Sequence, residues 1–343
     1  MKITEKLVDL TKFPGIAGFE EEFAEIVCEK LMEYCDDIRK TKTGNVVGEI
    51  KSKSENAPTI MLEAHLDRIG LIVKSIDENG FVGFETLGGV DERILPAAEV
   101  YILGKKNIFG IVGAKPPHLM NKDETDEGLK IKDMLIDTGF SGDELRSFVR
   151  VGDPILLKSE FAELSANRVS SAALDNRAGM AVVFDCLENL KGVELPCNLQ
   201  IAFAKGEELG LQGANTIIGE TKPDLAVVLD VTYGRTPDAG ENGTFPLGCG
   251  AVICRGPNLH YQMTKRVIEV AKKKGIPYEI EVASGSSGTN AWVIQVSGGG
   301  VPCVLISIPL RYMHTTVETV DLRDMKNASK LLAEIVSGGE VVA

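Results

Sequence analysis

The middle of the chain, from about residue 72 to 165, has a different hydrophobic pattern from the sequence on either side of it. Short apolar runs follow one another there, and Gly, Asn and Asp turns separate them. This pattern is typical of an all-β region. The expected strands are 71–76, 80–86, 99–103, 108–113 and 153–157, with one short helix near 143–148.

The flanking sequence instead alternates helices with continuous apolar strands. Large apolar residues recur at helical spacing within the first 35 residues, and again over 176–190 and 267–274. The expected strands are 45–50, 59–64, 198–204, 225–231 and 302–308. Such alternation predicts an α/β layer around a parallel or mixed sheet. Since 343 residues exceed what one core usually holds, we expect an α/β domain of residues 1–71 and 166–343, with residues 72–165 inserted as a β domain.

The charge and the apolar runs exclude several classes of partner. The formal net charge is −13, whereas nucleic acid binding needs a basic face. No apolar run approaches the ~20 residues of a membrane span, and charges interrupt the amino terminus too often for a signal peptide. The seven cysteines are scattered and never spaced as Cys-x-x-Cys. Reduced thiols in a cytoplasmic protein explain them best.

Histidines and carboxylates stand where the expected strands end. His65 closes the strand 59–64, His314 follows 302–309 by a short loop, and the run 225–229 ends on Asp230. The strand 198–204 leads into Glu207 and Glu208, and Asp175 opens the helix after 170–174. Ligands of open α/β sheets bind at the carboxyl ends of the strands, so these side chains are candidates for one site.

Imidazoles and carboxylates in this number suit a pair of divalent metal ions. Zinc, cobalt and manganese all accept such ligands. Two ions ~3.5–4 Å apart share a bridging carboxylate and a water, whose pKa they lower toward neutrality. A carboxylate that binds no ion can then take the proton. The adjacent Glu207 and Glu208 fit such a division of roles.

Each of these signals also has an ordinary explanation. A single acid at a strand end is more often a helix cap or a solvated loop residue. Adjacent acids occur by chance, and we assign no function to Glu20, Glu21 and Glu22. We also expect His118 and His260 to be structural. The prediction of a metal site rests on the combination and its order along the chain.

Eight short motifs make the sequence resemble the glutamyl and deblocking aminopeptidases of metallopeptidase family 42, and the resemblance covers nearly the whole chain. Members of that family assemble into tetrahedral particles, and some carry the names cellulase M or endoglucanase. The motifs are PGIAGFE at 14–20, AHLD at 64–67, LGGV at 87–90, KPPHL at 115–119, ALDNRAG at 173–179, EELGLQGA at 207–214, DVT at 230–232 and RYMH at 311–314.

The resemblance implies a zinc-aminopeptidase-like mixed-sheet catalytic domain with an inserted small β-barrel that serves as the dimerisation domain. It also implies two divalent ions, most typically zinc or cobalt, and release of amino-terminal residues from peptides. Each role passes to the matching residue of this chain. The implied ligands are His65, Asp175, Glu208, Asp230 and His314, with Asp175 bridging, Glu208 and His314 on one ion, Glu207 as general base and Asp67 orienting His65.

Three positions depart from the family pattern, and each removes an acid near the site. Arg68 and Asn176 stand where the family usually has Glu and Asp, and Asn290 stands where it has Asp. The resemblance further implies a cis peptide between Asp175 and Asn176. A less acidic pocket would accept an acidic amino-terminal residue, which Arg68 or Arg255 could pair with.

Other functions remain open on the sequence alone. A glycoside hydrolase would use two carboxylates without metals. The three lost acids motivate a third alternative, a metal-binding homologue with weakened catalysis, although the retained Glu207 argues against it. A related amidohydrolysis, such as deacylation, would use the same kind of site. The partners we expect are peptides and further copies of the chain, as dimers that assemble into a dodecamer.

Overall fold

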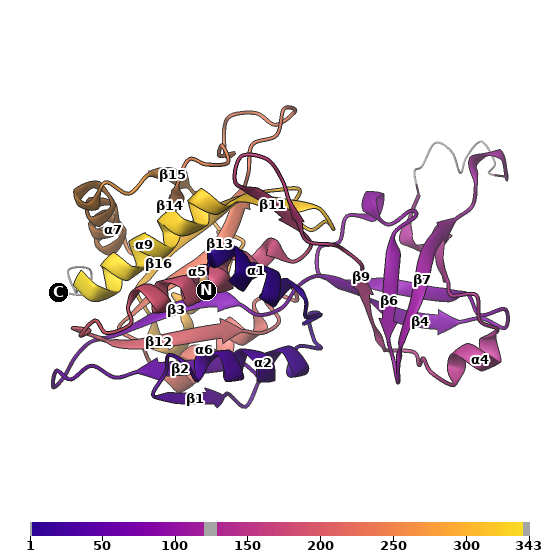
Figure 1. The fold of residues 1–343 in the computed structure, drawn as a ribbon, viewed down its shortest axis with the longest axis horizontal. Helices are drawn as coiled ribbons and strands as arrows, with labels where there is room; N and C mark the ends of the chain where they lie inside the picture. The colour runs from indigo at the N-terminus through magenta and orange to yellow at the C-terminus, as the bar shows by residue number, and fades with distance from the viewer. Residues whose placement is uncertain (1, 120–128, 339–343) are drawn as a thin grey trace.

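The computed structural model describes residues 2–119 and 129–338 and consists of two lobes joined by a narrow connection (Figure 1). The larger lobe is a mixed sheet with helices on both faces. The smaller lobe is a closed barrel of antiparallel strands. The predicted fold class, an α/β layer with a small inserted β-barrel, is therefore confirmed.

The centre of the large sheet consists of four strands that are buried along nearly their whole length. β12, β3, β13 and β16 run parallel to one another in that order, and antiparallel strands continue the sheet on both sides. Continuous apolar runs are what parallel strands covered on both faces require. The sheet contains β1 (Asp37–Lys40), β2 (Val46–Ile50), β12 (Asn198–Ala204), β3 (Thr59–His65), β13 (Leu225–Tyr233), β16 (Cys303–Arg311), β17 (Glu318–Asp321), β11 (Arg168–Ser171) and β10 (Ala162–Glu163), with β14 (Ala251–Arg255) and β15 (Tyr278–Val282) branching from β16.

Alternate side chains of each strand enter two separate apolar layers. Ile60 and Leu62 of β3 belong to one layer, whereas Met61 between them belongs to the other. This is the two-residue period of a strand. The first layer is covered by α1 (Ile3–Thr11), α2 (Glu21–Leu31), α5 (Leu174–Asn189), α7 (Tyr261–Lys274) and α9 (Leu322–Gly338), and the second by α6 (Gln212–Thr221) and α8 (Ala291–Ile294), with the short η4 (Ser297–Gly299) beside α6.

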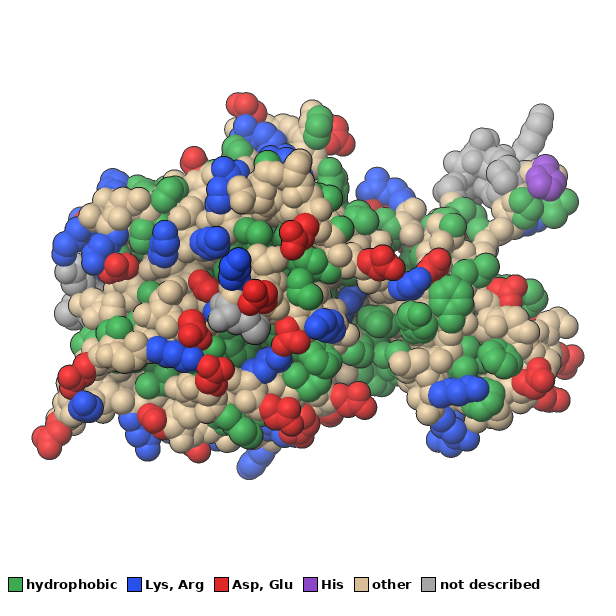
Figure 2. Space-filling view, in the orientation of Figure 1, with side chains coloured by type: hydrophobic (Ala, Val, Ile, Leu, Met, Phe, Trp, Pro, Cys, Tyr) green, Lys and Arg blue, Asp and Glu red, His purple; other side chains and the backbone are tan. Residues whose placement is uncertain are grey.

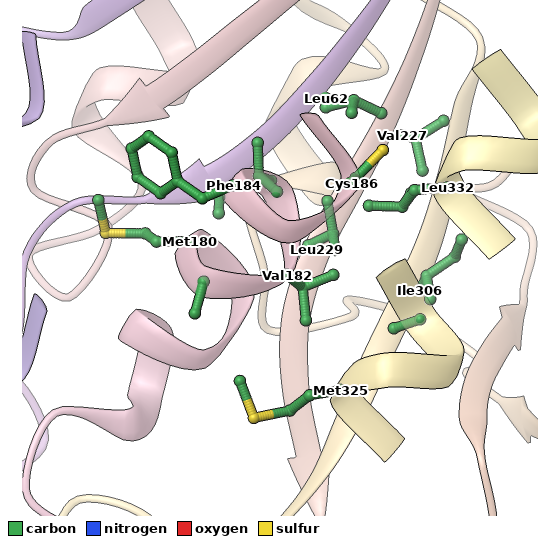
Figure 3. Packing of buried hydrophobic residues seen from close by; sticks show 14 of the residues in the cluster. Leu62, Met180, Val182, Phe184, Cys186, Val227, Leu229, Ile306, Met325 and Leu332 are labelled. Carbon is green, nitrogen blue, oxygen red and sulfur yellow. The ribbon is translucent and has the colours of Figure 1, made fainter. Parts of the chain in front are cut away.

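Helix α5 lies in the centre of the first layer, between the sheet and the helices α1 and α9 (Figure 1). Its side chains are buried on nearly every side, so it lacks the polar face of a surface helix. Figure 3 shows Val182 and Cys186 of α5 among side chains of β13, β16 and α9. The start of α5 is therefore held firmly beneath the carboxyl edge of the sheet.

The barrel closes in the order β4, β5, β8, β7, β6 and β9. In β7 buried and exposed residues alternate almost perfectly, as expected for a strand with one face inward. Its elements are β4 (Gly70–Ile76), β5 (Val82–Leu87), η1 (Glu92–Ile94), β6 (Glu99–Leu103), β7 (Asn107–Ala114), η2 (Pro117–Leu119), η3 (Ile131–Asp133), β8 (Met134–Asp137), α4 (Gly142–Arg146) and β9 (Pro154–Leu157).

The expected elements occur with small shifts at their ends. The helix expected at 143–148 is α4, which ends two residues earlier, and the helix expected at 267–274 begins six residues earlier in α7. The sequence analysis did not predict the helices α6, α8 and α9 or the strands β1, β8, β10, β11, β14, β15 and β17. Among the described residues, no helix is long and apolar enough to cross a bilayer.

Candidate metal centre

The side chains predicted to form a site meet at the carboxyl edge of the large sheet. His65 ends β3, Asp230 lies near the end of β13, and Glu207 and Glu208 follow β12. His314 lies in the loop after β16, and Asp175 lies at the start of α5. Because the four strands are parallel, their carboxyl ends share one edge, and the structure brings all of these residues together there.

Asp175 lies between two groups of possible ligands. On one side, His65 Nε2 is 2.9 Å from Asp175 Oδ1 and 3.9 Å from Asp230 Oδ1. On the other side, His314 Nε2 is 3.4 Å from both Asp175 Oδ2 and Glu208 Oε2. In each group the ligand atoms lie within 4.8 Å of one another. The two oxygens of Asp175 thus face different triads, as a bridging carboxylate must.

Asp67 holds the loop that carries the two adjacent glutamates. Its two carboxylate oxygens accept hydrogen bonds from the backbone N–H groups of Glu207 and Glu208, at 2.9 and 3.0 Å. His65 Nδ1 lies 3.1 Å from the backbone oxygen of Asp67 and 3.6 Å from its Oδ1. A proton on Nδ1 would satisfy this contact and leave Nε2 facing the cluster.

Glu207 differs from its neighbour in what its carboxylate touches. Both glutamates offer a carboxylate oxygen within 4.8 Å of a ring nitrogen of His65. Glu208 also lies within reach of His314, whereas no described residue donates a hydrogen bond to the carboxylate of Glu207. Burial raises the pKa of Glu207 to about 9. The side chain still lines the open cavity, so it can meet a water or a substrate.

Carboxyl groups outnumber cationic groups in this cluster. Burial raises the pKa of Asp230 to about 7 and also raises the pKa of Glu208. Burial lowers the pKa of His314, but hydrogen bonds with Asp175 and Glu208 outweigh it and raise the value to about 11. Acids that hold protons and an imidazole that keeps its charge both indicate crowded carboxylates. Divalent cations would offset this crowding, so the donor set fits two metal ions.

Three further residues position the candidate ligands, and the sequence analysis assigned none of them a role. Glu318 accepts the backbone N–H groups of Asp175 and His314, at 3.1 and 2.9 Å. The carbonyl of Gly89, in the loop after barrel strand β5, lies 2.9 Å from His314 Nδ1. Glu20 is buried, and its Oε1 accepts the N–H of Gly206 at 3.0 Å. Glu20 therefore supports the loop before Glu207, although we had assigned it no function.

The three positions that depart from the family pattern lie behind the ligands. Asn176 donates to the backbone oxygen of Leu229 at 2.9 Å and accepts from the N–H of Gly179 at 3.0 Å. Asn290 donates to the buried Glu63 at 2.7 Å. Arg68 is buried, and Glu318 and Glu208 are the acids that act on its charge. The peptide between Asp175 and Asn176 is cis.

A cavity opens over the cluster, and its lining does not include the two arginines considered for substrate binding. Arg68 is buried beneath the site, and Arg255 lies on β14 with its guanidinium over the ring of Tyr261. The structure therefore does not support either arginine as a partner for an acidic substrate. The lining residues are Gly89, Asp175, Glu207, Glu208, Leu211, Asp230, Val231, Thr232, Tyr233, Glu281, Ser287, Gly288, Thr289, Leu305, Ser307, Met313 and His314.

The two histidines expected to be structural lie away from this cavity. His260 precedes α7, and its Nδ1 accepts the backbone N–H of Met263 at 3.3 Å, which makes it a helix cap. His118 lies in η2, on the barrel. Neither residue belongs to a cluster of possible ligands among the described residues.

Comparison with known proteins connects this site to one family. The family model for M42 glutamyl aminopeptidase matches residues 44–331. A lysyl aminopeptidase of Pyrococcus furiosus is 32% identical over 95% of this chain and 94% of its own length. Nearly complete coverage in both directions means that the match spans both lobes of this chain.

Solved structures agree with that match. A TET aminopeptidase from the marine sediment archaeon Thaumarchaeota archaeon SCGC AB-539-E09 has a TM-score of 0.93 at 31% identity, covering 99% of this chain and 98% of its own. The TET1 peptidase of Pyrococcus horikoshii, which can assemble into a tetrahedron or a large octahedral shell, has a TM-score of 0.85 at 29% identity, covering 98% and 99%. A Thermotoga maritima protein named as an endoglucanase has a TM-score of 0.81 at 27% identity, covering 98% of both chains.

Proposed function

Because the chain belongs to the M42 glutamyl aminopeptidase family, and is thus a metallo-aminopeptidase, we propose that it uses two divalent ions to release amino-terminal residues from peptides. The observation that carries this proposal is the position of Asp175, whose two oxygens face two separate ligand triads.

His65, Asp175 and Asp230 would hold one ion, and Asp175, Glu208 and His314 the other. Two divalent ions bound there would supply Lewis acidity and a water of lowered pKa. Zinc and cobalt suit these imidazole and carboxylate donors. The role of Asp67 would be to fix the loop of Glu207 and Glu208 and the orientation of His65.

Glu207 would act as the general base. Its carboxylate lines the cavity without a hydrogen-bond donor among the described residues, so it is free to take a proton from the attacking water. As the water oxygen bonds to the peptide carbon, the carbon–nitrogen bond breaks, and Glu207 passes the proton to the leaving amine. The one residue thus serves as base and then as acid.

The crowding of carboxylates argues against the glycoside hydrolase alternative, despite the name of the Thermotoga maritima relative. The two acids of a glycosidase flank a sugar bond and lie about 5–10 Å apart. Here four acids belong to three histidine-containing triads, and within each triad the ligand atoms lie within 4.8 Å of one another. A catalytically weakened homologue is the second alternative, because Arg68, Asn176 and Asn290 surround the site.

The barrel offers a surface for self-association. Phe109 and Ile111 on β7 and Leu135 on β8 are each more than 40% exposed, and Figure 2 shows apolar side chains gathered on the part of the barrel that carries β6 and β7. Contiguous exposed apolar patches typically mark an interaction surface. We propose that this face joins dimers that assemble into a dodecamer, with residues 72–165 as the dimerisation domain. Light scattering would measure the particle mass.

We also keep the cytoplasm as the proposed compartment. All seven cysteines are free, and burial raises the pKa of Cys186 and of Cys303. Buried thiols of this kind suit a reducing environment.

Chelation tests the proposed function. Protein treated with a chelator should lose hydrolysis of leucine p-nitroanilide and recover it with zinc or cobalt, with two ions bound per chain by elemental analysis. N-acetyl-leucine p-nitroanilide should stay intact, because its α-amine is blocked. Activity on carboxymethylcellulose that survives the chelator would instead establish the glycosidase.

A further inference from the structure

One acid in the cavity wall takes no part in the metal centre. Glu281 lies on β15. This strand pairs with β14, which in turn pairs with β16 of the large sheet. Its Oε1 accepts the hydroxyl of Thr232 at 2.9 Å. Thr232 comes two residues after Asp230 on β13, so their side chains share one face of that strand. The carboxylate of Glu281 therefore lies beside the centre but outside both triads.

The described lining of the cavity offers this carboxylate no lysine or arginine as a partner. Among the described residues that line the cavity, none is Lys or Arg, and His314 already faces Asp175 and Glu208. Burial raises the pKa of Glu281, and the hydroxyl of Thr232 only partly opposes that rise. Two divalent ions would balance the charges of Asp175, Glu207, Glu208 and Asp230. The charge of Glu281 would remain unbalanced.

The position of Glu281 suits the end of a long side chain. Residues two apart on one face of a strand are separated by about 7 Å, so Thr232 and its partner Glu281 lie about that far beyond Asp230. A substrate whose α-amine binds at the centre would direct its first side chain into the same cavity. Leu211, Val231, Leu305 and Met313 also line it. Such apolar walls pack against the methylene stem of lysine or arginine while the charged end reaches an acid.

We propose that Glu281 is a specificity-determining residue, and that it makes this cavity prefer peptides with an amino-terminal lysine or arginine. The proposal rests on the proposed aminopeptidase function, because it assumes that the substrate α-amine lies at the metal centre. It also replaces the expectation of an acidic substrate, since the acid that would repel glutamate lines the cavity and Arg68 and Arg255 do not.

Binding of free amino acids tests the proposal without turnover. Calorimetry would compare L-lysine with L-norleucine, which has the same stem but no ammonium group, on the zinc-loaded full chain. A charged hydrogen bond in a partly buried site should make lysine bind about 10- to 100-fold more tightly. Glu281→Gln should bring the ratio close to one. Glu279→Gln is the matched control, because Glu279 lies exposed on the same strand and does not line the cavity.

Turnover gives the second measurement. With lysine and arginine p-nitroanilides, Glu281→Gln should lower kcat/KM about 10- to 100-fold, whereas kcat/KM for the leucine anilide should stay near the wild-type value. Retained leucine turnover also shows that the variant is folded and holds its metals. Glu281→Asp, which keeps the charge, should restore part of the lysine preference.

The outcomes distinguish failure of the Glu281 proposal from failure of the aminopeptidase proposal. If no anilide is hydrolysed with metal present, the aminopeptidase proposal fails, while the lysine and norleucine titration still decides the role of Glu281. If leucine is hydrolysed but lysine binds no better than norleucine, the Glu281 proposal is overturned and the aminopeptidase stands. Equal losses for lysine and leucine anilides in Glu281→Gln would also overturn it.

Discussion

The two lobes differ in what they bury. Among the described residues of the barrel, every buried side chain is apolar, whereas the α/β lobe buries more than a dozen charged or polar ones. The buried charges include Lys6, Glu20, Glu63, Arg177 and Asp324, in addition to the metal-site residues. Buried charge is costly unless it is paired. The barrel is therefore organised for stability and contact, and the α/β lobe carries the chemistry.

The separation between the lobes is incomplete at one place. The loop after barrel strand β5 reaches the metal site, where Gly89 contacts His314 and Gly88 packs beside Glu208. A Cβ atom on Gly89 would lie 2.8 Å from His314 Nδ1. The described residues of the barrel thus contribute backbone groups to the proposed centre, but no side chain of its candidate ligand groups.

The largest effect should follow from removing the proposed base of the α/β lobe. Glu207→Gln should lower kcat for a peptide anilide about 10²- to 10⁴-fold, while bound metal and thermal stability stay near wild type, because Glu207 is not a proposed ligand. Initial-rate assays would measure kcat, elemental analysis would measure bound metal, and thermal unfolding would measure stability. Glu78→Gln, on the exposed surface of the barrel, should change none of the three. Normal turnover in Glu207→Gln would show that Glu207 is not the general base.

A cavity in the barrel core should affect stability without affecting the centre. Ile102 is fully buried in the barrel, so Ile102→Ala should lower the free energy of unfolding by about 2–5 kcal/mol. Denaturant titration would give that value. Metal content of the folded variant should stay at the wild-type level. Loss of metal at a temperature where the variant is folded would show that the lobes are coupled through the barrel core.

A substitution in the loop after β5, which carries Gly89, should have a smaller and more specific effect. Gly89→Ala pushes His314 away from its place, so one of the two ions should bind about 10- to 100-fold more weakly, with the other ion unchanged. Calorimetric titration of zinc into metal-free protein would resolve the two steps. Gly240→Ala is the control, since a Cβ there would meet nothing within 4 Å. Two unaltered binding steps in Gly89→Ala would confine the metal centre to the α/β lobe.

The smallest effect concerns pH. Because burial raises the pKa of Glu281 above its usual 4.5, this carboxyl should begin to take up a proton at a higher pH than an exposed glutamate. The lysine preference over norleucine should therefore be complete near pH 8 and decline as pH falls toward 5. Calorimetry over this range would measure the ratio. In Glu281→Gln the ratio should not change with pH, and a parallel decline there would assign the effect to another group.

The sequence could predict the fold and the proposed ligands because both follow local patterns. His65 and Asp230 come at the ends of apolar runs, and parallel strands bring such ends to one edge. Helix α9 was missed although Met325, Leu332 and Ile335 recur at helical spacing. The apolar period of α9 is present in the sequence, so this helix is predictable from local pattern alone.

The residues that support the site could not be predicted in the same way. Glu318 acts through two backbone N–H groups that lie far apart in the chain. Gly89 acts through its carbonyl oxygen, which every residue has. Glu281 lies in a strand whose mixed polarity gives no sign of a site. Only the pairing of β15 with β14 places it in the cavity wall. Tertiary packing gives such residues their roles, and the sequence alone holds no pattern for it.

The most direct test of the central claim is the position of bound metal. Anomalous diffraction at the zinc edge, from crystals of zinc-loaded protein, should show two peaks about 3.5–4 Å apart. One peak should lie among His65, Asp175 and Asp230 and the other among Asp175, Glu208 and His314, with Glu207 bound to neither. A single peak, or a peak with Glu207 as a ligand, would contradict the two-metal account with Glu207 as base.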